Sequence, residues 1–360
     1  MRTALVVGTE RSGSTWLANI LDAHPEVELW MEPFAAAARL FPGLPEREVP
    51  VGADASELAR ELRGRLAALS AHKHPLLYRR GRPTWLRSVD TQIASATRRA
   101  AAALGLSTPL WVRRYELLSL NAAALPARRL PTKHARATLR VLKELRLNFK
   151  LGLVAAALPD ARVVAILRGP ITQVASIERL LDRGRLGELR ERLPRILSVI
   201  SSHPRFARYA PLAAHADAAA DRASALALWW LVSNQTLLED LRASGLVHAV
   251  VRHEELCAAP EPAVAALLRF CTLPPDPGVT RFVHWSSSAD GATGSPVDTQ
   301  RRSAVHAQRA LEQAPPELRH RVETTLARAR ELGVLDPELA DLAGSTATAA
   351  RAAAAAGAVR

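Results

Sequence analysis

The feature that most constrains this chain is its first 22 residues, in which an apolar run, a glycine loop and an amphipathic segment follow one another. Residues 4–7 are all apolar, as in strands that are buried on both faces of a parallel sheet. Residues 8–13 are mostly polar and begin and end with glycine. Residues 14–22 place apolar side chains at helical spacing. Strand, glycine loop and helix in this order predict a phosphate-binding α/β fold.

The same alternation of strands and helices returns later in the chain. Residues 138–142 and 162–167 predict strands, residues 149–158 predict a helix between them, and Pro170 is placed to begin the next helix. An apolar helix around residues 226–241 leads to a further strand at 246–251, and Trp229 and Trp230 in that helix are expected in the core. Strands that alternate with helices predict a mainly parallel central sheet with helices on both faces.

The domain organisation is predicted from length and from changes in composition. Residues 1–338 are expected to form one domain, which is long enough to bury a large core. Residues 43–135 are helical in pattern, punctuated by proline and basic, which favours an inserted cap over the active site. Residues 285–298 predict a long loop, and the Ala-rich residues 339–360 predict a frayed helix or a disordered tail.

The formal net charge of +13 comes almost entirely from arginine, because only four residues are lysines. Arginine suits phosphate, sulfate and carboxylate, although an Ala- and Arg-rich chain also fits a bacterium with a GC-rich genome. Cys257 and Cys271 are too few for a disulfide framework or a four-ligand zinc site, which fits a reducing cytoplasm. No leader and no run of about 18 apolar residues is present, so a cytoplasmic protein without a membrane span is expected.

The glycine loop differs from a nucleoside-triphosphate loop at one decisive position. Residues 8–15, GTERSGST, match the pattern GxxxxGK[ST] except that Ser14 replaces the lysine that neutralises the β- and γ-phosphates. Arg11 supplies a positive charge from a different position, and successive backbone N–H groups still make an anion site. The loop therefore predicts a smaller anion without magnesium, with a purely structural turn as the alternative.

Three motifs close to the N-terminus resemble the carbohydrate sulfotransferases. They are ERSGSTWL at residues 10–17, DAHPE at residues 22–26 and LWMEPF at residues 29–34. In order and spacing they are similar to the loop, the HP pair and the MEP segment of the Golgi galactose/N-acetylglucosamine 6-O-sulfotransferase group. This resemblance implies a donor, 3′-phosphoadenosine 5′-phosphosulfate (PAPS), and its product adenosine 3′,5′-bisphosphate (PAP).

The resemblance continues through two later segments. VVAILRGP at residues 163–170, with Ser176 eight residues after Arg168, resembles the family's 3′-phosphate-binding strand and helix, and VRHEEL at residues 251–256 resembles its RYEDL segment. Gly169 stands where the family has an acidic residue, and His253 stands where it has tyrosine. Neither departure removes a positive charge that could contact the donor, but each changes a residue that shapes its loop.

The resemblance implies a role for each matching residue. Arg168 and Ser176 hold the 3′-phosphate, and Arg301 or Arg302 completes that site. The residues implied to hold the 5′-phosphosulfate end and the rest of the donor lie in the first loop and helix: Arg11, Ser12, Gly13, Ser14, Thr15 and Trp16.

The general base is assigned by the same resemblance. Cytosolic sulfotransferases have a KTH segment that supplies a histidine, but here Leu145 occupies that position. Several carbohydrate enzymes use a glutamate after the first loop, and Glu32 is the match, in an extended or turning conformation because Pro33 follows it. His24 is the rival base and a candidate for substrate contact. Lys143 is a candidate for contact with the transferring sulfate.

These observations predict a PAPS-dependent sulfotransferase that acts by in-line displacement on a hydroxyl of a carbohydrate or glycosylated small molecule, without a metal or a nucleic-acid partner. A P-loop kinase or NTPase is the alternative enzyme, and it would require the missing lysine. A nucleic-acid-binding module would explain the charge, but aromatic residues make up only 4% of the chain. A non-catalytic PAP-binding protein is the third alternative. The acceptor and the oligomeric state are not predicted.

Overall fold

Five parallel strands form the centre of the computed structural model, in the spatial order β2-β3-β1-β4-β5. The structure describes residues 1–34, 44, 49–51, 55–72, 137–184, 186–216, 220–288 and 310–344, with the side chains of 68–72, 187, 188, 285 and 288 left aside. The strands are β1 (Arg2–Gly8), β2 (Val27–Met31), β3 (Leu139–Glu144), β4 (Arg162–Leu167) and β5 (His248–Arg252). Every neighbouring pair is parallel, so all five strands end at the same edge of the sheet.

Successive side chains of the central strand enter two separate cores, because side chains alternate across a sheet. Leu5 and Val7 of β1 belong to one buried cluster and Ala4 and Val6 to the other. All four are fully buried. An uninterrupted apolar run is therefore required in β1, which explains why the sequence pattern identified it.

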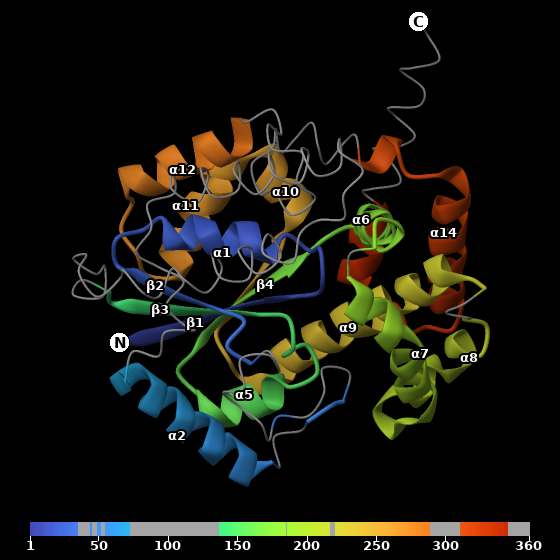
Figure 1. Cartoon of the computed structure of the whole chain (residues 1–360), viewed down its shortest axis with the longest axis horizontal. Coiled ribbons are helices and arrows are strands. Elements are labelled where there is room, and N and C mark those ends of the chain that lie inside the picture. The colour runs from blue at the N-terminus through green and yellow to red at the C-terminus, as the bar shows by residue number, and fades with distance from the viewer. Residues whose placement is uncertain are drawn as a thin grey trace, which may run out of the picture.

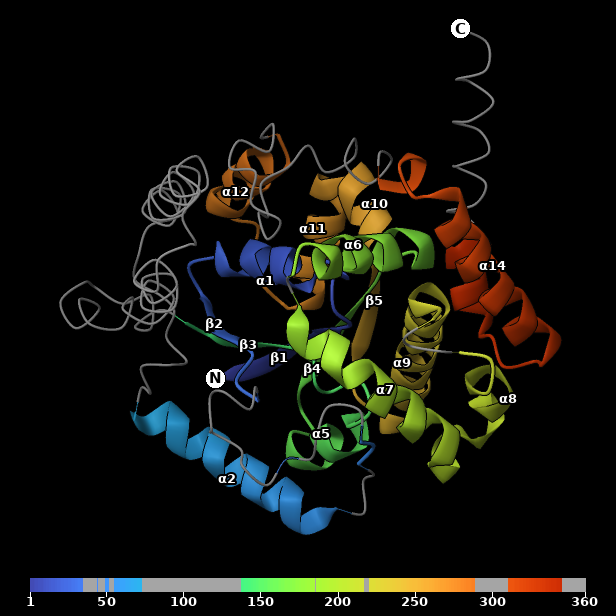
Figure 2. The same ribbon diagram turned by 45° about the vertical axis from the view of Figure 1, so that its right-hand side comes forward.

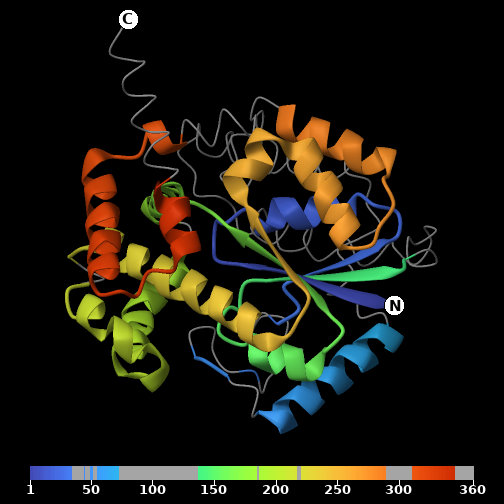
Figure 3. The same cartoon turned by 180° about the vertical axis from the view of Figure 1, so that it is seen from behind.

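Helices cover both faces of the sheet (Figure 1). One face packs against α1 (Ser14–Asp22), α10 (His253–Ala258), α11 (Pro260–Phe270) and α12 (Pro277–Ser288). The other face and the adjoining core are formed by helices that follow β3 and β4 and by the C-terminal helix, and Figure 3 shows this group from behind. They are α5 (Leu151–Ala157), α6 (Pro170–Asp182), α7 (Gly187–Ser202), the 3₁₀ helix η5 (Pro204–Tyr209), α8 (Ala210–Ala213), α9 (Arg222–Ser244) and α14 (Pro316–Glu331).

The predicted elements that carry the strongest periodicity are confirmed. Helix α1 and strand β4 have the predicted bounds, and α6 begins at Pro170 as expected. Trp229 and Trp230 are both buried in α9. Strand β2 was not predicted, because a glutamate at its second position interrupts the apolar run of its sequence VELWM. Glu28 is nevertheless buried, where its carboxylate accepts a hydrogen bond from Trp30 Nε1 at 3.0 Å.

The segments outside the sheet are described in part. Of residues 43–135, the structure chiefly describes α2 (Ser56–His72), which packs against α5 below the sheet (Figure 2). The long loop predicted from residue 285 is wrong at its start, since α12 continues to Ser288. Residues 337–344 are helical, with Leu339 and Leu342 buried, and residues 345–360 lie outside the described part. None of the described helices combines the length and apolar composition that crossing a membrane requires.

The central position of β1 leads to a prediction about stability. Leu5→Ala removes a fully buried side chain from the middle strand, and we expect it to lower the free energy of unfolding by about 2–5 kcal/mol. The exposed Leu332 provides the control, since Leu332→Ala is expected to change that free energy by less than about 0.5 kcal/mol. Urea unfolding of the two variants checks this, and an equal effect of both substitutions would contradict the assignment of Leu5 to the core.

Candidate functional site

The candidate site lies where the strands end. Gly8 is the last residue of β1, Met31 of β2, Glu144 of β3 and Leu167 of β4. The chain leaves β1 toward α1 on one face and leaves β3 and β4 toward helices of the other core, so the direction of winding reverses beside β1. Ligands of open α/β sheets bind in the crevice at such a switch point. The residues that follow these strand ends are therefore the ones that can meet on one ligand.

The loop after β1 requires both of its glycines. Gly13 has a φ of 96°, in the left-handed region, and a Cβ atom built on it would lie 2.4 Å from His253 Nδ1. A Cβ on Gly8 would lie 2.6 Å from Ser12 Oγ and 2.9 Å from the carbonyl oxygen of Ile166. The loop thus folds tightly between the end of β4 and the end of β5, where no other residue type fits without displacement.

Arg11 sits at the top of this loop in a left-handed conformation, with a φ of 65°. Such a conformation is uncommon for a residue with a side chain, and residues held in it are concentrated at functional sites. Glu32, the predicted base, has the same property, with a φ of 48°. Two residues selected from the sequence for their chemistry are therefore also held in strained backbone conformations.

The loop leads directly into the N-terminus of α1, which offers backbone donors. Gly13 is the N-cap residue and no side chain caps this end, so the first N–H groups of the helix point beyond it. Ser12 is fully buried, and its hydroxyl has no hydrogen-bond partner among the described residues. Ser14 and Thr15 are the first two residues of the helix, of which Ser14 is buried and Thr15 half-buried. Donors and a positive helix end in this arrangement fit a phosphate-like anion.

Arg168 joins the end of β4 to this loop. Its Nη1 donates to the carbonyl oxygen of Arg11 at 3.0 Å, and its Nε donates to Thr172 Oγ1 at 3.1 Å. Arg11 in turn reaches α6, where its Nε donates to Ser176 Oγ at 3.2 Å. The structure therefore brings together the loop after β1, Arg168 and Ser176, which were selected from segments more than 150 residues apart.

Gln173, which the sequence did not single out, and Trp230, which it predicted only as a core residue, stabilise this arrangement. Gln173, buried on the first turns of α6, donates from Nε2 to the carbonyl oxygen of Glu10 at 2.6 Å and also to Thr9 Oγ1. Trp230 Nε1 donates to the carbonyl oxygen of Arg168 at 2.9 Å. The signal for Gln173 was weak, because a single glutamine in an apolar helix turn is not by itself a motif.

The acidic group that the loop after β4 lacks in sequence comes from another segment. Glu254, at the start of α10, accepts from the Gly169 N–H at 3.0 Å and from Thr172 Oγ1 at 3.3 Å. This hydrogen bond from Gly169 to the Glu254 carboxylate restrains the backbone at Gly169, the residue that precedes α6. The departure at Gly169 is thus compensated across the fold by the residue after His253.

Lys143 and Glu32 form an ion pair at the ends of β3 and β2. Lys143 Nζ lies 2.5 Å from Glu32 Oε1, and the Glu32 N–H donates to the Lys143 carbonyl oxygen at 2.7 Å. The lysine side chain is 1% exposed and the glutamate side chain 41% exposed. The pair therefore presents a carboxylate toward solvent at the carboxyl edge of the sheet, with a buried cation behind it.

Glu144 holds the turn that carries Glu32, a role that the sequence did not reveal. Its buried carboxylate accepts from the Phe34 N–H at 2.8 Å through Oε2, and from the Leu145 N–H at 2.8 Å through Oε1. Burial raises the pKa of Glu144 above its ordinary value, and the nearby charge of Glu32 raises it further. Glu144 is therefore a positioning residue that ties residues 32–34 to the end of β3.

The remaining predicted site residues lie elsewhere or outside the described part. His24 is buried between α1 and the start of β2, where Nε2 lies 3.0 Å from the Pro274 carbonyl oxygen and Nδ1 accepts from the Glu26 N–H. That is the amino edge of the sheet, so His24 and Glu32 are not brought together. Trp16 is buried and donates to Ser286 Oγ at 3.0 Å. Arg301 and Arg302 lie outside the described residues.

The thiols and the acidic side chains give no sign of a metal site in the part of the chain that the structure describes. No three histidine, cysteine, aspartate or glutamate side chains are grouped there in a way that could hold a metal ion. Cys257 lies beside His253, with Sγ 3.5 Å from His253 Nε2, and burial raises the pKa of its thiol to about 12. It therefore remains a neutral packing residue.

Comparison with known proteins connects this geometry to one family. A family model described as "Sulfotransferase family" matches residues 4–277. Among solved structures, the sulfotransferase domain of the Synechococcus PCC 7002 olefin synthase is 15% identical, covering 90% of this chain and 94% of that one, with a TM-score of 0.41. Sulfotransferase STF9 from Mycobacterium avium is 14% identical, covering 79% of this chain and 67% of that one, with a TM-score of 0.33. No curated protein matches the chain.

The burial of Glu144 leads to a prediction about pH. Because its pKa is raised in the folded state from an ordinary 4.5, its contribution to stability is greatest at low pH and declines as pH rises through the folded pKa. Glu144→Gln abolishes this titration and leaves one buried N–H without an acceptor, at a cost of about 1–3 kcal/mol. We expect the loss of unfolding free energy to be larger at about pH 5 than at about pH 8.

Urea unfolding at the two pH values measures this difference, with the exposed Glu57→Gln on α2 as the control. A loss of stability that grows with pH would show that Glu144 is favoured as the charged form, contrary to the assignment.

Proposed function

We propose, starting from the fact that this chain belongs to the sulfotransferase family, that it transfers a sulfuryl group from PAPS to a hydroxyl of a carbohydrate or a glycosylated molecule. One observation carries the proposal. Arg168 and Ser176, implied to hold the 3′-phosphate, both contact Arg11 of the loop implied to hold the 5′-phosphosulfate. A donor that carries phosphates at both ends needs two anion sites close enough to bind one molecule. The contacts of Arg11 with Arg168 and Ser176 support such an arrangement.

The residues present fit the donor. The uncapped N-terminus of α1 offers backbone N–H groups for the 5′ end, and the buried Ser12 hydroxyl lies next to them. The two loop glycines leave no room for a Cβ, because Ser12, Ile166 and His253 pack against them, so the tight loop conformation depends on glycine at both positions. Arg168 contacts the loop from the end of β4, where its Nη1 donates to the carbonyl oxygen of Arg11. These groups are donors and cations throughout, as a doubly anionic ligand requires.

The chemistry divides between the donor and the chain. When bound, PAPS supplies the sulfuryl group and a phosphate leaving group for in-line displacement. Glu32 lies at the same edge of the sheet as the loop, partly exposed, and takes the proton of the acceptor hydroxyl onto its carboxylate. Lys143 neutralises that carboxylate at rest and supplies positive charge beside the reacting groups. Glu144 fixes the turn, which limits the positions that Glu32 can adopt.

A carbohydrate acceptor is supported by the motifs around the base. Leu145 occupies the position of the histidine of cytosolic sulfotransferases, and its side chain cannot take a proton. Glu32 in the MEP segment fills the role, as in the carbohydrate group that the N-terminal motifs resemble. Cys257 and Cys271 are both buried free thiols, in keeping with a bacterial cytoplasmic enzyme.

Incubation with PAPS and a panel of saccharide and phenolic acceptors tests the proposal. We expect release of PAP together with a product heavier by one SO₃ group, in the absence of added metal. A purified protein that neither binds PAP nor consumes PAPS would exclude the proposed function.

The role of Glu32 leads to a kinetic prediction. Glu32→Gln keeps the shape of the side chain but cannot accept the proton, so kcat is expected to fall by about 10²-fold or more while PAP affinity is retained. Sulfate transfer is measured with the best acceptor found, and PAP binding by calorimetry. Glu57→Gln is the matched control on the exposed face of α2. Turnover equal to that of the control would remove Glu32 from the reaction.

The role of Arg168 leads to a prediction about binding. Arg168→Ala removes a charge-assisted contact, which is expected to weaken PAP affinity by about 10- to 100-fold. The exposed Arg269→Ala on α11 removes the same charge elsewhere and should leave the affinity unchanged. Calorimetry of both variants with PAP checks this, and equal affinities would show that Arg168 does not contact the donor.

A further inference from the structure

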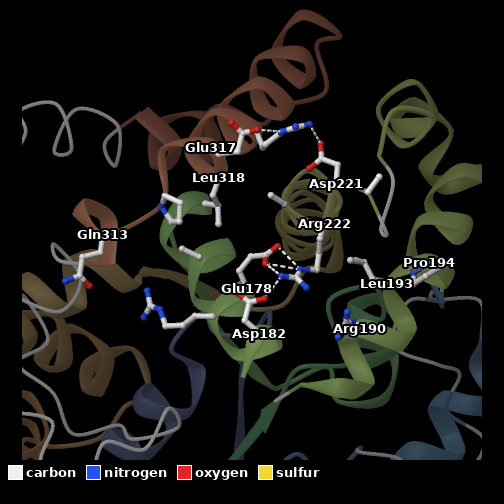
Figure 4. Close-up of a pocket in the computed structure, with 16 residues that line it drawn as sticks. Glu178, Asp182, Arg190, Leu193, Pro194, Asp221, Arg222, Gln313, Glu317 and Leu318 are labelled. Atoms are coloured by element: carbon white, nitrogen blue, oxygen red, sulfur yellow. Dashed lines mark hydrogen bonds and ion pairs between the residues drawn. The ribbon is translucent and has the colours of Figure 1, made fainter. Parts of the chain in front are cut away.

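A cavity lies against the side of α6 that faces away from the loop after β1. It has a volume of about 840 Å³, is partly open to solvent, and is bordered by α6, α7, the start of α9 and the region that begins α14 (Figure 4). Its size falls within the range of small-molecule sites, about 300–1,000 Å³. On α6, the lining positions are centred roughly 110° around the helix from Ser176, at about 100° per residue. The cavity therefore adjoins the candidate donor site without sharing the hydroxyl of Ser176.

One wall of the cavity is outside the part of the chain that matches the family. Gln313, Pro315, Glu317, Leu318 and Arg321 line the cavity, whereas the family match ends at residue 277. Chemistry that the family shares is not expected to depend on this wall. Part of the cavity wall therefore lies outside the segment that the family model describes.

The charges of the lining are tied to one another across helices. Arg222 of α9 binds Glu178 and Asp182 of α6, with its Nε 2.9 Å from both carboxylate oxygens of Glu178 and its Nη2 2.6 Å from Asp182 Oδ1. This contact spans the cavity floor in Figure 4. A bidentate arginine contact of this kind is geometrically specific. The floor is thus a preformed set of oriented polar groups.

A second ion-pair group forms the opposite rim. Arg321 contacts Asp221 Oδ2 at 2.8 Å through Nη1 and Glu317 Oε1 at 2.9 Å through Nε. Arg179 and Arg190 also line the cavity, and neither makes an ion pair within the described part of the chain. Among the described residues, the lining holds four carboxylates and four arginines, whose formal charges sum to zero.

This lining favours one class of ligand. Each carboxylate retains lone pairs beyond those used by arginine, and the guanidinium groups retain N–H donors. The cavity can therefore both accept from and donate to hydroxyl groups, while Leu193 and Leu318 offer small apolar surfaces. None of the described lining residues is aromatic, so this part of the lining offers no ring on which a nucleobase or a phenol could stack. The formal charges of these residues, which sum to zero, do not select an anion.

We propose that this cavity is a saccharide-binding site, which takes an uncharged oligosaccharide segment through its hydroxyl groups. The proposal rests on the cavity alone and not on the donor chemistry. It adds to the proposed function a second place at which a glycan contacts the protein.

Binding of neutral trisaccharides to the full chain tests the proposal. The probes are maltotriose, cellotriose and N,N′,N″-triacetylchitotriose, with a sulfated heparin disaccharide and 4-nitrophenol as comparison ligands, all measured by calorimetry with and without PAP. We expect at least one neutral trisaccharide to bind, and to bind more tightly than either comparison ligand.

The double variant Asp182→Asn with Arg190→Gln alters two exposed lining side chains without changing the net charge. It should weaken trisaccharide binding by about tenfold or more. Arg330→Gln with Glu331→Gln makes the same change at exposed positions of α14 outside the lining, and should have no effect. Thermal unfolding confirms that both variants are folded.

The outcomes separate this proposal from the proposed function. Absence of trisaccharide binding, equal binding by the two double variants, or tighter binding of the heparin disaccharide or the phenol would each overturn the saccharide site. PAP affinity is expected to be the same in both variants and in the unaltered chain. Failure of PAP to bind the unaltered chain would instead count against the sulfotransferase proposal. The saccharide proposal would still be decided by the trisaccharide measurements alone.

Discussion

The contact between the Arg168 guanidinium and the Arg11 carbonyl oxygen is the interaction on which the rest of the site depends. It is partly buried, it joins the loop after β1 to the end of β4, and it leaves the remaining N–H groups of the arginine for other partners. A carbonyl oxygen that points at an arginine also fixes the peptide that follows it, which leads into Ser12 and Gly13 of the loop. The left-handed conformation of Arg11 is thus held by a contact from a different strand.

The same principle recurs at the other end of the candidate site. Glu32 is in a left-handed conformation, and its turn is held by Glu144, which belongs to β3. In both cases the residue proposed to carry the chemistry has a strained backbone, and a buried polar residue at the end of a neighbouring strand holds it. Backbone strain of this kind persists only where the surrounding structure determines it. The parallel sheet provides that support, because all of its strands end beside one another.

The architecture separates shared chemistry from features of this chain. The loop, Arg168, Lys143 and Glu32 all lie within the residues that match the family, at the carboxyl edge of the sheet. The cavity beyond α6 is completed by α14, which lies after that match. Helix α6 is common to both, since one of its faces carries Ser176 and a neighbouring face carries Glu178 and Asp182. The proposed saccharide site could therefore change in evolution without altering the proposed donor site.

The sequence by itself determined the elements whose signal is local. The apolar run of β1, the spacing of α1, the proline that begins α6 and the residues Arg11, Arg168 and Glu32 could all be identified from neighbouring residues in the chain. The residues that hold them could not. Glu144, Gln173 and Glu254 act on backbone groups 80 or more residues away, and nothing next to them in sequence records those partners. Only the tertiary structure decided their roles, as it decided that His24 lies at the opposite edge from Glu32, because parallel pairing of distant strands sets which side chains meet.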